Sequence, residues 1–147
     1  MKVGILALQG AFAVHEEMLQ SLGANTVQVR TAEDLKLVDA LVMPGGESTT
    51  MSHLLNTSQL FDPIAERIKD AMPIFGTCAG MILLAKSIAD GRPDQRFYGA
   101  IDIDIQRNAY LPRCLPRRRL VAFFLTPARQ QFRQVLCLFD AVLFPKT

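Results

Sequence analysis

The sequence predicts an α/β fold whose mostly parallel sheet is flanked by helices on both faces. Up to Gly99, short apolar runs typical of buried strands alternate with segments of helical periodicity. Glycine-containing turns follow two of these runs and precede helical segments. The chain has 147 residues, 50% of them hydrophobic, which is enough for one domain with a packed core.

The first strand is predicted at residues 3–8, where an unbroken apolar run fits a strand that is buried on both faces. A helix is expected at residues 11–22, and Gly23 supplies its stop signal. Its apolar residues form one stripe, which we expect to face the core: Ala11, Val14, Met18 and Leu22. Its polar residues are expected to face away: Glu16, Glu17 and Gln20.

The later elements continue this alternation. Strands are predicted at residues 26–30, 39–43 and 73–75, and helices at residues 32–37, from Ser48 onward, at 60–71 and at 79–89. The hydroxyl of Ser48 suits a helix N-cap. Residues 100–106 alternate apolar with polar side chains, which favours an edge or antiparallel strand, and no element is assigned from Arg107 onward.

Charge and glycine divide the chain into two parts. Residues 1–105 hold 8 Lys+Arg and 13 Asp+Glu, whereas residues 106–147 hold 8 Lys+Arg and one acid, Asp140. All nine glycines lie at or before Gly99. The two parts therefore look like different kinds of sequence.

Several classes of function are excluded by what the sequence lacks. No apolar run is long enough for a membrane span, the N-terminus resembles a strand rather than a signal peptide, and we expect a cytoplasmic protein. The three cysteines do not predict a disulfide framework, no Cys or His pair has zinc spacing, and no phosphate-binding loop is present. We expect no metal and no cofactor. The basic cluster at residues 113–119 is interpreted as a solvated face, so no nucleic-acid partner is expected.

The strongest local motif is Phe-Gly-Thr-Cys-Ala-Gly at residues 75–80, a strand followed by G-x-C-x-G and a helix. This is a nucleophile elbow with Cys78 in the place of serine. The helix N-terminus favours the thiolate and offers N–H groups to a developing oxyanion. The alternative is a buried, inert cysteine.

A second motif, Pro-Gly-Gly-Glu-Ser-Thr at residues 44–49, also links a predicted strand to a predicted helix. Adjacent glycines expose backbone N–H groups, and Glu47 and Ser48 could bind an amino group or a carboxylate. Because the carboxyl ends of parallel strands share one edge of a sheet, we expect this loop to lie near Cys78.

A thiolate that performs acyl transfer needs a general base, and the chain has two histidines. His15 is interpreted as a solvated side chain beside Glu16 and Glu17. His53 follows the Gly-Gly loop and is the candidate for a substitute base, although a structural role is favoured.

These motifs carry a family resemblance. Residues 3–10, 44–51 and 75–81 closely resemble the glutaminase subunit of pyridoxal 5'-phosphate synthase, the PdxT family of class I glutamine amidotransferases. The resemblance covers about residues 1–110, within a single glutaminase-like domain at 1–147, and includes Arg-Asn-Ala-Tyr at 107–110.

The resemblance implies hydrolysis of L-glutamine to glutamate and ammonia for vitamin B6 biosynthesis, with lyase activity in the synthase complex. Cys78 matches the family nucleophile, and the substrate contacts match Gly46, Glu47, Ser48 and Arg107. The backbone N–H groups of Gly46 and Ala79 would form the oxyanion hole. The implied partner is a PdxS-type synthase subunit, in an assembly of twelve subunits of each kind, and Gln9 lies where docking reaches the site.

The chain departs from the family after residue 110. The family ends with a His-Pro-Glu segment that supplies the base and its carboxylate, but here no histidine follows His53 and no acid follows Asp140. The family's Ile-Arg-Ala-Pro stretch is replaced by Val-Leu-Cys-Leu-Phe-Asp-Ala at 135–141. We therefore expect an atypical, shortened C-terminus, incomplete or altered by a frameshift. Two outcomes stay open for its activity: a glutaminase with an incomplete triad, or a chain that the missing base makes inactive. The alternative function is a non-catalytic module that binds the synthase.

Overall fold

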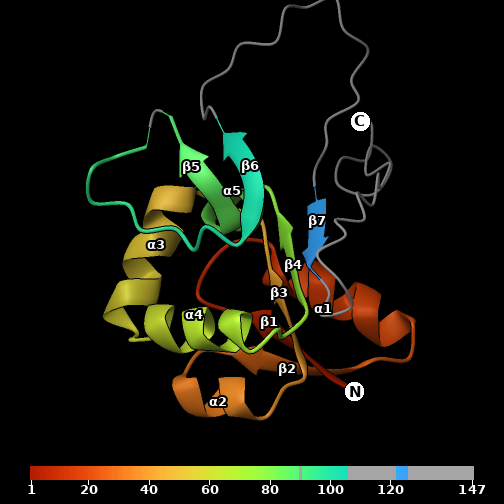
Figure 1. The fold of residues 1–147 in the computed structure, drawn as a ribbon. Helices are drawn as coiled ribbons and strands as arrows, with labels where there is room; N and C mark the ends of the chain where they lie inside the picture. Colours follow the sequence, from red (N-terminus) through yellow and green to blue (C-terminus); the bar gives the residue numbers. More distant parts are fainter. Residues whose placement is uncertain (90, 106–121, 126–147) are drawn as a thin grey trace, which may run out of the picture.

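Five strands form the central sheet in the order β2-β1-β3-β4-β7 (Figure 1). The computed structural model describes residues 1–89, 91–105 and 122–125, the last four as backbone only. The strands of this sheet are β1 (Lys2–Leu6), β2 (Asn25–Val29), β3 (Ala40–Met43), β4 (Ile74–Thr77) and β7 (Ala122–Leu125). The first four are parallel, whereas β7 runs antiparallel to β4 and pairs Ala122 with Thr77.

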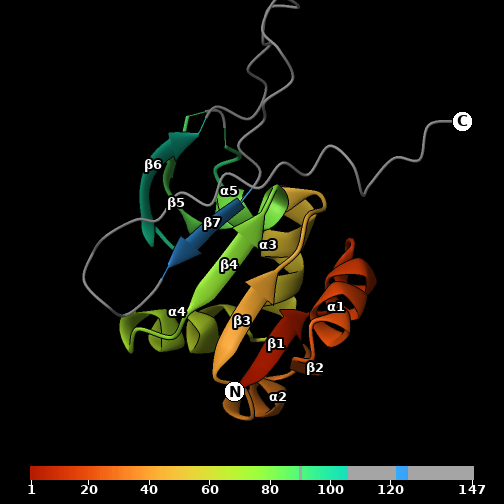
Figure 2. The same cartoon turned by 90° about the vertical axis from the view of Figure 1, so that its right-hand side faces the viewer.

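Helices cover both faces of this sheet (Figures 1 and 2). The helix α1 (Phe12–Ser21) lies alone on one face among the described residues. Four helices lie on the other face: α2 (Ala32–Lys36), α3 (Ser48–Thr57), α4 (Phe61–Lys69) and α5 (Ala79–Leu84). The predicted parallel α/β architecture is confirmed.

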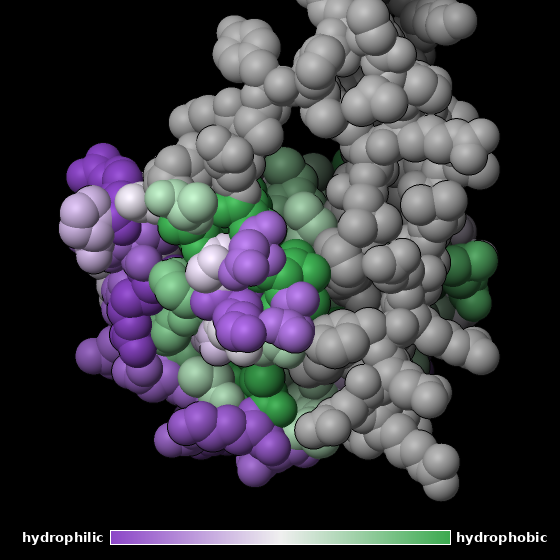
Figure 3. Space-filling model, turned by 45° about the horizontal axis from the view of Figure 1, so that its top comes forward, coloured by the Kyte–Doolittle hydropathy of each residue, from purple (hydrophilic) through white to green (hydrophobic). Residues whose placement is uncertain are grey.

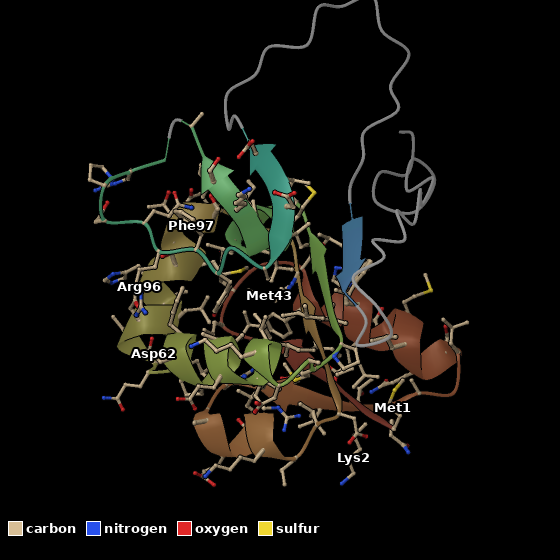
Figure 4. All side chains as sticks on the ribbon, in the orientation of Figure 1. Met1, Lys2, Met43, Asp62, Arg96 and Phe97 are labelled. Atoms are coloured by element: carbon tan, nitrogen blue, oxygen red, sulfur yellow. The ribbon has the colours of Figure 1, made fainter. Side chains whose placement is uncertain are left out.

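The strand side chains alternate between two hydrophobic clusters. Leu6, Leu41 and Met43 pack with the four helices into the larger cluster, and Met43 lies near its centre (Figure 4). Val3 and Ile5 point to the other face and pack against residues of α1. Both faces of β1 are thus buried, as its unbroken apolar sequence predicts.

The orientation predicted for α1 is wrong. Met18 and Val14 are each 38% exposed and Leu22 is 76% exposed, so the stripe expected in the core faces solvent. The residues partly buried against the sheet are instead Phe12, His15, Glu16 and Leu19. Glu16, which was expected to face away, accepts hydrogen bonds from two side chains of β2, Thr26 at 3.4 Å and Gln28 at 2.6 Å.

The helix predicted at residues 79–89 is also too long. It ends at Leu84, and the chain continues as β5 (Ala85–Ile88), which pairs in parallel with β6 (Ile101–Ile105) in a separate two-stranded sheet. Lys86 forms an ion pair with Asp102 at 2.8 Å, and Ser87 donates a hydrogen bond to Asp104. Residues 100–106 were expected to form an edge strand or an antiparallel strand. The first alternative agrees with this two-stranded sheet, whereas antiparallel pairing is wrong. The strand β7 was not predicted.

The segment between β5 and β6 runs along α3 and α4 and is fixed by Arg96. Its guanidinium contacts Asp62 at 2.6 Å and lies 3.8 Å from the centre of the Phe61 ring, and Figure 4 shows Arg96 above Asp62. Phe61 in turn stacks on Tyr98 at 4.3 Å. The Ser52 hydroxyl both donates to the carbonyl and accepts from the N–H of Arg96. These contacts join the two-stranded sheet to the helices.

Candidate active site at the carboxyl edge of the sheet

Cys78 occupies a sharp turn between β4 and α5. Its backbone has φ +47° and ψ −106°, a left-handed conformation that is unfavourable for a residue with a side chain. The thiol is exposed and lies at the start of α5, whose first N–H groups have no partner within the helix. The predicted strand, elbow and helix arrangement is confirmed.

The two glycines that flank Cys78 permit this turn. A methyl group on Gly76 would lie 2.8 Å from the backbone of α5 at Gly80 and Met81. A methyl group on Gly80 would lie 2.2 Å from the carbonyl oxygen of Met43 at the end of β3. The G-x-C-x-G spacing therefore reflects the close approach of α5 to two neighbouring strands.

The Gly-Gly loop lies beside the elbow, as expected. A methyl group built on Gly45 would be 3.3 Å from Cβ of Cys78, so the loop after β3 and Cys78 share one edge of the sheet. Ligands of open α/β folds bind at this edge. Figure 3 views this end of the molecule and shows hydrophobic and hydrophilic side chains side by side near its middle.

A third loop, after β1, holds the Gly-Gly loop in place. The N–H of Ala11 donates to the carbonyl of Gly45 at 3.3 Å, and the side-chain amide of Gln9 donates to the carbonyl of Glu47 at 3.0 Å. Gly10 has φ +84°, and a methyl group there would lie 1.9 Å from the carbonyl oxygen of Gly45. The two loops therefore touch through their backbones.

Glu47, rather than Ser48, is the N-cap of α3. Its carboxylate accepts hydrogen bonds from the N–H groups of Thr49 at 3.0 Å and Thr50 at 2.6 Å, whereas Ser48 is buried in the first turn. Desolvation raises the pKa of Glu47, but these hydrogen bonds outweigh it and lower the pKa from 4.5 to about 2. Glu47 is therefore ionised at neutral pH. The predicted Ser48 cap is wrong because the helix already includes Ser48, and the residue before it, Glu47, is the cap.

The interpretation of His15 as a solvated side chain is wrong. Its Nε2 lies 3.2 Å from the hydroxyl of Thr77, and its ring meets the Phe75 ring edge-on at 6.5 Å. Desolvation lowers the pKa of His15 below its usual value and so favours the neutral imidazole. The helical spacing from Phe12 through His15 to Leu19 is the sequence signal that could have indicated this inward face.

The remaining predicted residues are placed as follows. Ala79 is buried at the first position of α5, Gly46 lies against the side chain of Gln9, and His53 is exposed on α3. Arg107 lies outside the described residues.

Within the described part of the chain, no cluster of His, Cys, Asp and Glu is arranged to hold a metal ion. No helix in that same part is long and apolar enough to cross a membrane.

Known proteins are similar to this chain in sequence and in fold. The model of the SNO glutamine amidotransferase family matches residues 5–116. A protein of Roseiflexus sp. strain RS-1 named pyridoxal 5'-phosphate synthase subunit PdxT is 56% identical over 110 residues, which cover 75% of this chain and 58% of the relative. A protein of the same name from Herpetosiphon aurantiacus is 57% identical over 111 residues, again 75% of this chain and 58% of the relative.

A solved structure titled crystal structure of glutamine amidotransferase superposes with a TM-score of 0.70 at 38% identity. The match covers 83% of this chain and 68% of that one. The chain thus spans 58% of the length of the first two relatives.

Proposed function

Because the chain belongs to the SNO glutamine amidotransferase family, we propose that it is a glutaminase subunit of pyridoxal 5'-phosphate synthase. The proposed reaction is hydrolysis of L-glutamine to glutamate and ammonia. The observation that carries the proposal is the placement of an exposed, strained Cys78 beside the backbone of the Gly-Gly loop. That arrangement brings a nucleophile and hydrogen-bond donors to one edge of the sheet.

In the proposed chemistry, the Cys78 thiolate attacks the side-chain amide carbon of glutamine. The tetrahedral oxyanion is bound by the N–H groups of Gly46 and Ala79. Its collapse breaks the C–N bond while a water molecule donates a proton to the nitrogen, which leaves as ammonia, and the hydroxide formed is the species that attacks the thioester in the next step. That attack hydrolyses the thioester to glutamate and returns the thiol. Two N–H donors aimed at the oxyanion contribute about 3 kcal/mol each in comparable acyl-transfer sites.

We assign substrate binding to Gly46, Glu47, Ser48 and Arg107. Glu47 supports this assignment because its carboxylate is ionised and held at the start of α3, so it can attract the α-ammonium group of an amino acid. Arg107 is assigned from the family motif alone.

A second candidate function is a non-catalytic module that binds the synthase. The observation that favours it is the placement of the two histidines within the described residues: His15 is hydrogen bonded to Thr77, and His53 is exposed on α3. Lacking a positioned base lowers acyl-transfer rates by about 10²–10⁴.

In both candidates the partner is a synthase subunit, and an assembly of twelve subunits of each kind in the cytoplasm is part of the proposal. Residues 1–147 are taken as one glutaminase-like domain.

The two candidates separate in a single experiment. The chain and its Cys78→Ala variant are mixed with a PdxS-type synthase subunit, and both complex formation and ammonia release from L-glutamine are measured. Glutaminase function predicts release that the variant abolishes. The binding-module function predicts a complex without release, and the absence of both complex and release would contradict both candidates.

A further inference from the structure

A histidine from α1 contacts the end of β4 directly before the nucleophile. The Nε2 atom of His15 is hydrogen bonded to the hydroxyl of Thr77 at 3.2 Å, and the His15 ring rests edge-on against Phe75. Thr77 and Phe75 alternate with Gly76 along β4, so both contacts fall on the face of the strand that α1 covers.

Thr77 is a buried residue, only 7% exposed, and its side chain carries a polar group. A buried hydroxyl without a hydrogen-bond partner destabilises the folded state, and His15 supplies the partner for Thr77. The backbone of Thr77 is held separately by its pairing with Ala122 of β7. The side-chain bond to His15 therefore adds a second restraint to the residue that precedes the elbow.

The elbow needs such restraints because Cys78 is strained. A side-chain-bearing residue at φ +47° persists only where its neighbours hold it there. On the other side of the turn, the backbone of Gly45 lies close to Cys78: a methyl group built on Gly45 would be 3.3 Å from Cβ of Cys78. A turn that relaxes would move the thiol away from the start of α5 and from the Gly-Gly loop.

We infer that His15 is a positioning residue for Cys78, acting through Thr77 to hold the turn that presents the thiol. The inference rests on the proposed function only in naming Cys78 as the nucleophile. His15 does not exchange a proton with substrate in this role. It is a fixed side-chain partner for Thr77, and it couples α1 to the active-site strand.

The test is the alkylation rate of Cys78 by iodoacetamide, followed by mass spectrometry of the peptide that contains it. His15→Phe keeps an aromatic ring against Phe75 but removes the hydrogen bond, and we expect alkylation at pH 7 to slow about fivefold because the turn that presents the thiol is loosened. His15→Gln places an amide near the former Nε2 and should restore the rate to within about twofold. Glu17→Gln, an exposed change on the same helix, is the matched control.

A substitution of Thr77, the hydrogen-bond partner of His15, tests the same interaction from its other side. Thr77→Val should slow alkylation as much as His15→Phe, and the double variant should be no slower than either, because both remove one shared interaction. Wild-type alkylation rates in His15→Phe and Thr77→Val would overturn the inference, as would additive effects or failure of His15→Gln to restore the rate. Alkylation requires neither glutamine nor a partner, so a chain that fails to hydrolyse glutamine still gives a readable result.

Discussion

The contact between the loops after β1 and β3 predicts different costs for two glycines with nearly the same backbone conformation. Gly10 has φ +84° and Gly23 has φ +80°, so an alanine at either position carries a similar backbone strain of about 1–2 kcal/mol. They differ in their surroundings. A methyl group at Gly23 meets no atom within 4 Å, whereas one at Gly10 would lie 1.9 Å from the carbonyl oxygen of Gly45.

The extra cost of Gly10→Ala follows from that distance. Ordinary contacts of a methyl group begin at 3.4 Å, so the Gly45 carbonyl must move, and overpacking of this kind costs about 1–3 kcal/mol. The movement also breaks the hydrogen bond from the N–H of Ala11 to that carbonyl, worth about 1 kcal/mol. We therefore expect Gly10→Ala to be less stable than Gly23→Ala by about 3 kcal/mol.

Urea unfolding followed by circular dichroism measures this difference, and thermal unfolding should show a gap of roughly 9 °C for a domain of this size. Under the proposed function, Gly10→Ala should also weaken glutamine binding, because the displaced carbonyl belongs to the loop beside Cys78. Equal destabilisation by the two substitutions would refute the reasoning, since it would mean that the loops are not in contact.

Three further substitutions test other parts of the account. Glu47→Gln should cost about 1 kcal/mol, because the α3 cap loses its charge and one of its two acceptor oxygens. The folded-state pKa of about 2 lies below the ordinary 4.5, so this stabilisation is present above pH 4.5 and is lost as the pH falls toward 2. The urea midpoints of wild type and variant should therefore converge in acid. Arg96→Ala should cost about 1 kcal/mol through the lost contacts with Phe61 and Asp62, with Arg96→Lys intermediate, and full stability of the alanine variant in urea would contradict this packing. Gly80→Ala should cost about 3 kcal/mol and slow Cys78 alkylation, and an unchanged alkylation rate would show that α5 does not need its close approach to β3.

The loops of the candidate site could be predicted from the sequence because their chemistry is local. Gly76 and Gly80 flank a cysteine between an apolar strand and a helix, and the structure shows that both glycines are required by backbone contacts. Two glycines after a second strand likewise predict a loop at the same edge. These signals depend on steric rules that act within a few residues.

The orientation of α1 could not be obtained in the same way. Hydrophobicity alone favours the stripe of Val14, Met18 and Leu22, but the sheet offers polar partners to Glu16 and His15. The partner on β2 lies 12 residues further along the chain and the partner on β4 lies 62 residues further, both in other elements. A rule that counts apolar residues cannot weigh such hydrogen bonds.

The strand β5 was missed for a related reason. The sequence after Leu84 continues a helical pattern, but pairing with the alternating strand β6 satisfies its backbone and brings Lys86 to Asp102. Tertiary pairing overrides local propensity in short segments of this kind. The antiparallel pairing of β7 with β4 is equally invisible in the local pattern.

The central claim is that Cys78 is the nucleophile of a glutamine site. The most direct measurement is covalent labelling by a diazoketone analogue of L-glutamine, with the modified peptide identified by mass spectrometry. The account predicts a single label on Cys78 that L-glutamine slows in proportion to its concentration. Labelling of Cys114 or Cys137 at the same rate, or labelling of Cys78 that L-glutamine does not slow, would contradict it.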